Sequence, residues 1–508
     1  MARPARVPLP VFDLASWLAL APPPAQDKTF SSSEQRMVPG PARVPPRRGW
    51  AAPGGGRAPL MLRVPVFRGS TAEVQGLYPW LYGAGIPAVG AYLGMDCLTG
   101  GAFCCHPLEW LRLGLVSNPN IVITGVPGAG KSATIKALGM RLITYGVRMF
   151  VCGDLKNEYA GMARVLGTEP VELGPGLPGR LNPLDAGPLG DHLPADQAEL
   201  AERLAEIHRR RLILLASLLT MRLGRPLTPT EEAALSYAIT EASGRQSCGP
   251  GGGGAGDARG GARRPSPTIP QVWALLRDPP PDMADDLRVP SGGELREMIR
   301  PIADALGNMV RGSLSGLFDG PTTIQPDFAA PIQTVDLSRI SGRGDETVAM
   351  TLACVSSWGQ AAVDEPGPVR MIVRDELWRS LRIPALISKV DSDLRLSRAH
   401  GTIQVLATHR LSDFEAAGDA GSAEASIAAN LIASCDIRVC LRQDTAPLAM
   451  TREQVGLTDT ECAHIASWTG LQTGRAVWKI GRAASAVVQT VLTPDERRLY
   501  WTNERMAV

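Results

Sequence analysis

Short apolar runs alternate with segments of helical periodicity from about residue 115 to the end of the chain. Each apolar run is bounded by glycine, charged or turn-forming residues, which is typical of buried strands. Helical segments between such strands indicate a parallel sheet. The runs predicted to be strands are residues 121–124, 149–152, 369–373, 403–407, 437–441 and 476–480. This pattern predicts an α/β fold with a mostly parallel sheet.

A long helical stretch separates the second predicted strand from the third. Residues 195–222 carry apolar side chains at helical spacing, which predicts an amphipathic helix. In Thr228-Pro229-Thr230-Glu231, Thr228 is a predicted N-cap and Glu231 completes a capping box, so a second helix begins there. Further helices are predicted over 269–276 and 293–309. The α/β core therefore carries an all-helical insertion.

Composition divides the chain further, because glycine and proline are concentrated in two stretches. The predicted parts are a flexible Pro/Gly/Arg-rich N-terminal arm over 1–60, a small N-terminal module over 61–115, the first part of the core over 116–190, the helical insertion over 191–335 with a glycine-rich linker over 244–267, and the second part of the core over 336–508.

The net charge of +2, from 52 Lys and Arg against 50 Asp and Glu, does not indicate a nucleic-acid-binding protein as a whole. The basic arm alone is compatible with contacts to nucleic acid or acidic lipid, and equally with a solvated tail in an arginine-biased sequence. Only six of the basic residues are lysines, so lysines mark positions where arginine would not serve.

Neither the cysteines nor the apolar segments indicate a disulfide scaffold, a metal centre or a membrane span. The nine cysteines contain no C-x-x-C pair, and the cluster of Cys97, Cys104, Cys105 and His106 has no second pair at finger spacing. Residues 75–95 lack charge but contain prolines and glycines that do not suit a lipid-exposed helix. We expect a cytoplasmic protein that is peripheral to the cell membrane through its partners.

A complete phosphate-binding motif, G-x-x-x-x-G-K-[ST], follows the predicted strand 121–124 and opens a helical segment. In this context, backbone N–H groups face the phosphates of ATP, Lys131 reaches the β- and γ-phosphates, and Ser132 supplies an oxygen to Mg²⁺. The residues predicted to hold the nucleotide are Gly125, Val126, Pro127, Gly128, Ala129, Gly130, Lys131, Ser132 and Ala133.

Two further predicted strands end in polar residues that suit nucleotide hydrolysis. The strand 369–373 leads to Asp375 and Glu376, predicted as the Mg²⁺ carboxylate and the general base that activates water. The strand 403–407 ends at Thr408 and His409, which either sense the γ-phosphate or cap the strand. Hydrolysis also needs a cation near the γ-phosphate, and an arginine of a neighbouring subunit can supply it. Arg395, Arg398 and Arg442 are candidates for this arginine; we favour Arg398, with Arg442 second.

Several motifs together resemble a known family. They include Gly153-Asp154-Leu-Lys156-Asn-Glu158-Tyr159, Asp375-Glu376-Leu-Trp378 and Ala407-Thr408-His409-Arg410-Leu-Ser412-Asp413-Phe414. With the phosphate-binding motif, they resemble the conjugative transfer and type IV secretion assembly ATPases of the FtsK–HerA superfamily, over roughly residues 65–500. The resemblance implies a RecA-like core with a helical insertion, and ATP hydrolysis with Mg²⁺. It places Asp154, Lys156 and Glu158 near the nucleotide or at a subunit interface.

The family also implies partners, namely a homo-oligomer such as a hexameric ring, and channel subunits at the inner face of the membrane. We therefore expect an ATP-driven motor or assembly ATPase of conjugative transfer or type IV-like secretion. A DNA-pumping translocase or coupling protein, which would contact DNA directly, and a nucleotide-switched scaffold with little turnover stay open as alternatives. This sequence differs from the family pattern at His409, because such motors usually have glutamine after the threonine that corresponds to Thr408.

Overall fold

The structure is a computed structural model that describes residues 86–190, 193–245, 266–313, 315–324, 327–364, 367–377, 384–411, 427, 430–482 and 484–501. The predicted arm (1–60), the first part of the predicted module (61–115) and most of the predicted linker (244–267) lie outside these residues. All of the described residues belong to the compact unit that spans Tyr82–Val508.

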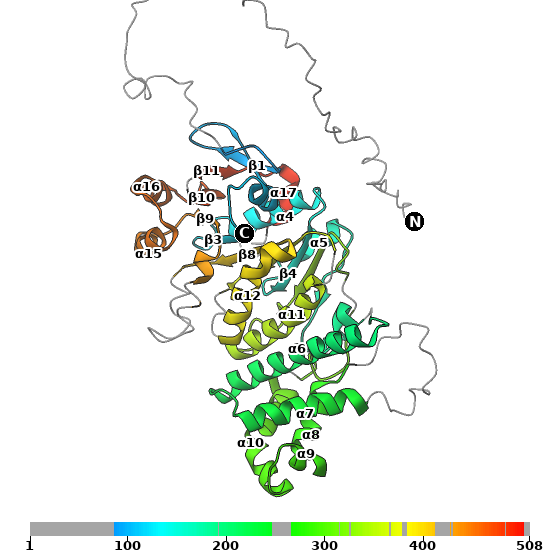
Figure 1. The fold of residues 1–508 in the computed structure, drawn as a ribbon. Helices are drawn as coiled ribbons and strands as arrows, with labels where there is room; N and C mark the ends of the chain where they lie inside the picture. Colours follow the sequence, from blue (N-terminus) through cyan, green and yellow to red (C-terminus); the bar gives the residue numbers. More distant parts are fainter. Residues whose placement is uncertain are drawn as a thin grey trace, which may run out of the picture. The chain divides into compact units, whose positions relative to one another are not determined.

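One sheet organises the described part of the chain (Figure 1), with eleven strands in the order β2-β1-β11-β10-β9-β3-β8-β7-β4-β6-β5. Strands β9 to β5 in this order pair in parallel, and β2, β1, β11 and β10 extend the sheet through antiparallel pairs. The strands are β1 Ala91–Asp96, β2 Ala102–Cys105, β3 Ile121–Thr124, β4 Arg148–Asp154, β5 Val171–Glu172, β6 Ile332–Asp336, β7 Arg370–Arg374, β8 Thr402–Thr408, β9 Ile437–Leu441, β10 Arg475–Ile480 and β11 Ala484–Thr490.

All six predicted strands are present, and each lies within two residues of its predicted bounds. Strands β1, β2, β5, β6 and β11 were not predicted. Strand β6 lies at the end of the range predicted for the insertion (191–335), and β1 and β2 come from the range predicted as a separate module. The expected α/β fold with a mostly parallel sheet is confirmed.

Helices cover both faces of the sheet. They are α3 Pro107–Arg112, α4 Lys131–Ile143, α5 Ala160–Val165, α6 Gln197–Leu223, α7 Pro229–Arg245, α8 Ile269–Arg277, α9 Pro281–Asp286, α10 Gly292–Asn308, α11 Asp345–Asp364, α12 Pro384–His400, α15 Thr445–Val455, α16 Asp459–Ser467 and α17 Pro494–Tyr500. Along β7, Met371 and Val373 pack into a core shared with Ile135 and Leu138 of α4. Ile372 points the other way, into a core shared with α11.

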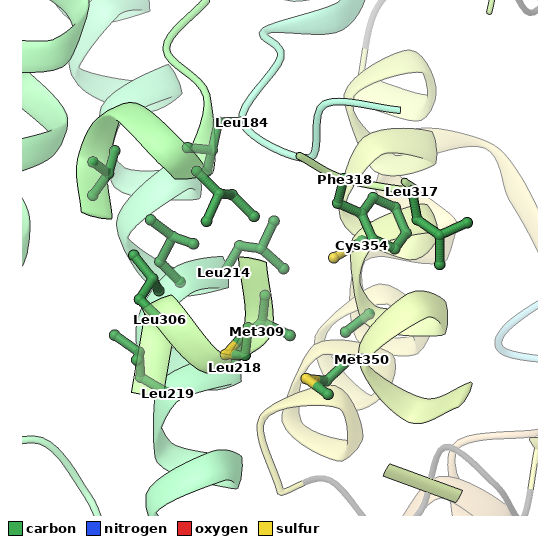
Figure 2. Close-up of a cluster of buried hydrophobic side chains, with 14 of the residues drawn as sticks. Leu184, Leu214, Leu218, Leu219, Leu306, Met309, Leu317, Phe318, Met350 and Cys354 are labelled. Carbon is green, nitrogen blue, oxygen red and sulfur yellow. The ribbon is translucent and has the colours of Figure 1, made fainter. Parts of the chain in front are cut away.

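Helices α6 to α10 form the predicted insertion and lie beyond α11, on its side away from the sheet (Figure 1). Leu214, Leu218 and Leu219 of α6 share one apolar core with Leu306 of α10 and with Met350 and Cys354 of α11 (Figure 2). The predicted capping box is present, because Thr228 Oγ1 accepts from the N–H of Glu231, and the Glu231 carboxylate accepts from the N–H of Thr228. The insertion is therefore packed onto the core by a continuous hydrophobic cluster.

Among the described residues, no helix combines the length and the apolar character that crossing a lipid bilayer requires.

Candidate active site

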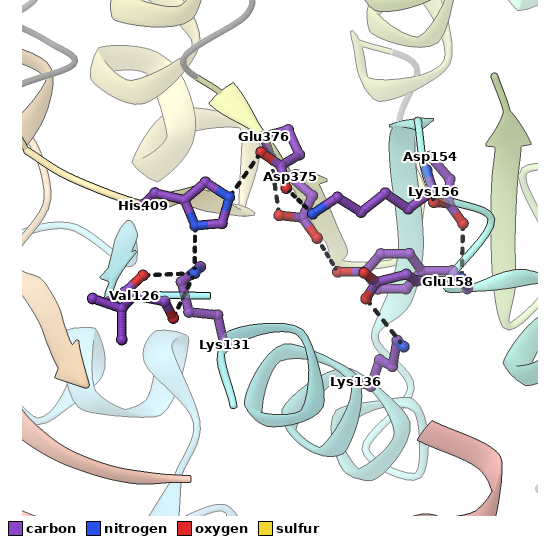
Figure 3. A network of polar contacts seen from close by, with 11 residues as sticks. Val126, Lys131, Lys136, Asp154, Lys156, Glu158, Asp375, Glu376 and His409 are labelled. Carbon is purple, nitrogen blue, oxygen red and sulfur yellow. Dashed lines mark hydrogen bonds and ion pairs between the residues drawn. The ribbon is translucent and has the colours of Figure 1, made fainter. Parts of the chain in front are cut away.

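The polar residues predicted from four separate parts of the chain meet at one edge of the sheet (Figure 3). Strands β3, β8, β7 and β4 are neighbours in that order and run parallel, so their carboxyl ends share one edge. That edge is where open α/β sheets bind ligands. The phosphate-binding loop follows β3, His409 follows β8, Asp375 and Glu376 follow β7, and the Asp154–Tyr159 segment follows β4.

Backbone hydrogen bonds join the phosphate-binding loop to the end of β9 and to the segment before β10. The N–H of Val126 donates to the carbonyl of Arg442, and the N–H of Gly474 donates to the carbonyl of Ala129. Gly130 has a φ of +104° and is the N-cap of α4; a Cβ there would come within 2.7 Å of the backbone nitrogen of Gly474. Only glycine fits both constraints, and the loop presents the amino end of α4 to an anion.

Lys131 is the first residue of α4, and its side chain turns back over the loop. Its Nζ donates to the carbonyl oxygens of Gly125 at 2.6 Å and Val126 at 3.3 Å. Burial lowers the pKa of Lys131 to about 8, although the carboxylates of Asp375 and Glu376 act in the opposite direction. Lys131 is therefore cationic at neutral pH, as an ammonium that binds phosphate must be.

A chain of polar contacts links this lysine to the predicted general base. Lys131 Nζ lies 2.9 Å from His409 Nδ1, and His409 Nε2 lies 3.2 Å from Glu376 Oε2. An ammonium can only donate, so His409 Nδ1 accepts from Lys131, and the other ring nitrogen, Nε2, lies beside the Glu376 carboxylate. His409 therefore connects the phosphate-binding lysine to the carboxylate that would activate water.

Glu376 is held on both carboxylate oxygens. His409 contacts Oε2, and Lys156 Nζ forms an ion pair with Oε1. Burial disfavours the charge on Lys156, but the hydrogen bond and charge of Glu376 outweigh it and raise the pKa of Lys156. Glu376 also has a φ of +52°, a left-handed conformation that a side chain with a Cβ rarely adopts. Such strain is common at functional sites, where surrounding contacts hold it in place.

The segment after β4 supports the two carboxylates of β7, and each of its polar residues has a separate role. The Asp154 carboxylate accepts from the N–H groups of Lys156 (3.2 Å) and Tyr159 (2.7 Å), so it shapes the loop. The Tyr159 hydroxyl donates to Asp375 Oδ2 at 3.1 Å. Glu158 pairs with Lys136 of α4 at 3.5 Å. Sequence reasoning assigned no role to Tyr159 or Lys136.

The scarcity of lysine in the sequence could have indicated these contacts. Lys131, Lys136 and Lys156 are three of the six lysines in an arginine-rich chain, and all three lie at this edge of the sheet. Lys136 is 1% exposed, and burial lowers its pKa. A compact ammonium fits such a narrow buried site where the planar fork of arginine would not.

The donor set fits Mg²⁺, which prefers hard oxygen ligands. Ser132 contributes a hydroxyl from the first turn of α4, and Asp375 contributes a carboxylate. Burial, with the charges of Glu158 and Glu376, raises the pKa of Asp375 to about 6. A carboxylate that is destabilised by burial and by neighbouring negative charge gains from a cation, so the residues present suit this ion.

Of the predicted arginines, Arg442 lies at this edge and Arg398 does not. Arg398 is exposed in the last turn of α12, which leads into the amino end of β8 and thus lies at the opposite edge of the sheet. Arg442 follows β9 and lies beside the phosphate-binding loop, where its carbonyl accepts from Val126. Thr408 Oγ1 donates to the carbonyl of Arg410 at 3.3 Å, a local cap of the strand end.

The chain has the RecA-like P-loop NTPase fold. The fold is similar to that of VirB4 of Thermoanaerobacter pseudethanolicus, with a TM-score of 0.60 and 21% sequence identity over 82% of this chain and 100% of that chain. The plasmid coupling protein TrwB in complex with ADP and Mg²⁺ is more distant, with a TM-score of 0.49 and 13% identity over 75% of this chain and 87% of that chain. No protein-family model and no curated protein sequence matches the chain.

Proposed function

We propose that this protein hydrolyses ATP with Mg²⁺ and drives a conjugative DNA-transfer or type IV-like secretion system. The observation that carries the hydrolysis is the continuous chain from Lys131 through His409 to Glu376, beside Asp375, at the ligand-binding edge of the sheet. The assignment to transfer or secretion is supported by the family motifs and by a fold similar to that of VirB4.

The contacts suggest how the residues act in turn. A γ-phosphate at the loop would compete with the carbonyls of Gly125 and Val126 for the Lys131 ammonium, and thereby weaken its bond to His409. Mg²⁺, held by Ser132 and Asp375, would offset the charge on the phosphates. His409 would still hold Glu376 in place through Nε2, and Glu376 would take a proton from the attacking water. In this way His409 would couple nucleotide binding at Lys131 to the orientation of the general base.

Two substitutions test the proposal. Glu376→Gln should retain nucleotide binding and lower turnover by about 10²–10⁴-fold, because an amide cannot accept the proton from water. Lys131→Ala should lose nucleotide binding or hydrolysis, because the phosphates lose their cation. Glu297→Gln, on the exposed face of α10, is the matched control and should behave as wild type. The measurements are ATPase rate and binding of a fluorescent ATP analogue.

The same measurements separate the alternatives. A Glu376→Gln protein that hydrolyses ATP at the wild-type rate would show that the general base is assigned wrongly. A wild-type protein that binds ATP without turnover would be the nucleotide-switched scaffold. Turnover that DNA strongly stimulates would favour the DNA-pumping translocase.

A further inference from the structure

A buried ion pair lies directly behind the two candidate carboxylates of β7. Arg374 is the last residue of β7; its Nη2 donates to Asp393 Oδ2 of α12 at 2.6 Å, and its Nη1 donates to Gln404 Oε1 of β8. Arg374 is 7% exposed, Asp393 5% and Gln404 1%. Lys389, on the same helix, contacts the second carboxylate oxygen of Asp393 at 2.9 Å. None of these groups contacts the phosphate-binding loop.

Strand alternation places this cluster on the face of the sheet opposite to Asp375 and Tyr159. Ile372 and Arg374 share one face, and Val373 packs on the other, against the core of α4. Asp375 continues the direction of Val373 and meets Tyr159 on that side. The corner from Arg374 to Asp375 is therefore fixed from both faces, by α12 behind and by Tyr159 in front.

Helix α12 does not pack closely on the insertion at this point. A cavity of about 620 Å³ is lined by α6, α11, α12 and β8, and Lys389, Asp393 and Gln404 form part of its wall. Leu214 and Leu218 of α6 form the facing part. This cavity is open to solvent, so α12 is not held against α6 there and has room to shift relative to it.

We propose that Arg374 is a positioning residue that ties the end of β7 to α12 and thereby makes hydrolysis depend on how α12 sits against the helical insertion. This inference rests on the proposed ATPase function. A buried ion pair typically adds little net stability compared with apolar residues of similar size. The guanidinium instead holds the end of β7 in one orientation, because its planar fork engages α12 and β8 at the same time.

The test removes the whole cluster without leaving a buried charge. The variant Arg374→Met/Asp393→Leu/Gln404→Met should melt near the wild-type temperature, because apolar replacement of a buried pair is close to neutral. We expect kcat to fall about tenfold, KM for ATP to stay within about twofold because the loop after β3 is untouched, and the Mg²⁺ concentration for half-maximal activity to rise. Lys389→Met, which removes only the outer contact to Asp393, is the control and should keep wild-type kcat.

Amide hydrogen exchange over residues 374–377, measured without nucleotide, should be faster in the triple variant. This readout is independent of turnover, so it tests the tether even if wild-type protein proves not to hydrolyse ATP, which would refute only the proposed function. Unchanged exchange and kcat in the triple variant, or an equal loss in Lys389→Met, would overturn the proposal. If the triple variant does not fold, Arg374→Lys decides: lysine lacks the planar fork that engages α12 and β8 in fixed directions, so a wild-type kcat there would overturn the proposal.

Discussion

His409 occupies the position at which motors of the resembled family usually have glutamine, and its contacts explain how it can serve there. One ring nitrogen accepts from Lys131, and the other contacts the Glu376 carboxylate. A glutamine amide offers the same pair of functions, through a carbonyl oxygen and an NH₂ group. We therefore expect His409→Gln to retain most of the ATPase rate and His409→Leu to lose most of it. Equal ATPase rates for both variants, in a steady-state assay, would show that His409 does not link Lys131 to Glu376 during hydrolysis.

Lys156 contacts the other oxygen of the Glu376 carboxylate, and removing Lys156 should raise the ATPase rate. A carboxylate oxygen engaged by an ammonium is not free to accept a proton from water, so Lys156→Met should raise the basal ATPase rate several-fold. Lys479→Met removes a similar pair, with Glu461 at 3.2 Å, far along the chain and is the matched control. A fall in rate for Lys156→Met would instead show that this lysine acts on the transition state.

The sequence predicts the part of the site whose residues are contiguous, and it does not predict the contacts between residues far apart in the chain. The phosphate-binding loop is recognisable because strand, glycines, lysine and helix are contiguous. The contacts of Lys156 with Glu376 and of Tyr159 with Asp375 join residues more than 200 positions apart. They exist because β4 lies beside β7, and sequence order does not show which parallel strands become neighbours.

Among the elements, the start of α7 gives a prediction that depends on pH. A hydrogen bond from Arg225 lowers the pKa of Glu231 to about 2, against the effect of burial, and the N–H of Thr228 adds to it. Because the folded-state pKa lies below the ordinary value of 4.5, this stabilisation is fully present above about pH 4.5 and is lost as the pH falls towards 2.

Glu231→Gln should therefore lower the melting temperature by roughly 2–4 °C at pH 7, the size expected for a helix cap. The difference from wild type should shrink as the pH falls through that window. Glu232→Gln changes the adjacent, exposed glutamate and should leave the melting temperature unaltered. Thermal unfolding monitored by circular dichroism at several pH values gives both results. A difference that persists at low pH would contradict the assignment.

The elements that the sequence missed share a physical cause. Strand β6 includes the polar residues Gln333 and Thr334, both buried, so its apolar run is interrupted. Strand β1 contains Gly94 at an irregular register with β2, and glycine weakens a strand signal. Burial by neighbouring elements, not intrinsic propensity, makes these segments strands.

For the whole molecule, we propose that Arg398 acts on the active site of a second copy of the chain. It lies at the edge of the sheet opposite to its own candidate active site, where a second copy could present a pocket. Mixing Arg398→Ala with Lys131→Ala, each inactive alone, should restore some ATPase activity, since one contributes an intact pocket and the other an intact arginine. Mixing Arg442→Ala with Lys131→Ala should not, because Arg442 lies beside its own loop. Absence of recovery despite verified co-assembly would exclude Arg398.

The order of strands in the sheet also bears on how the chain is made. Among the described strands, β3, which precedes the phosphate-binding loop, pairs with β8 and β9, and β9 ends at Leu441. A ribosome synthesises the loop early but must add more than 300 residues before both neighbours of β3 exist. Long-range pairing of this kind is slow and comes late in folding. Nascent or truncated chains therefore carry the complete phosphate-binding motif without a formed pocket, and nucleotide binding becomes a property of the finished polypeptide alone.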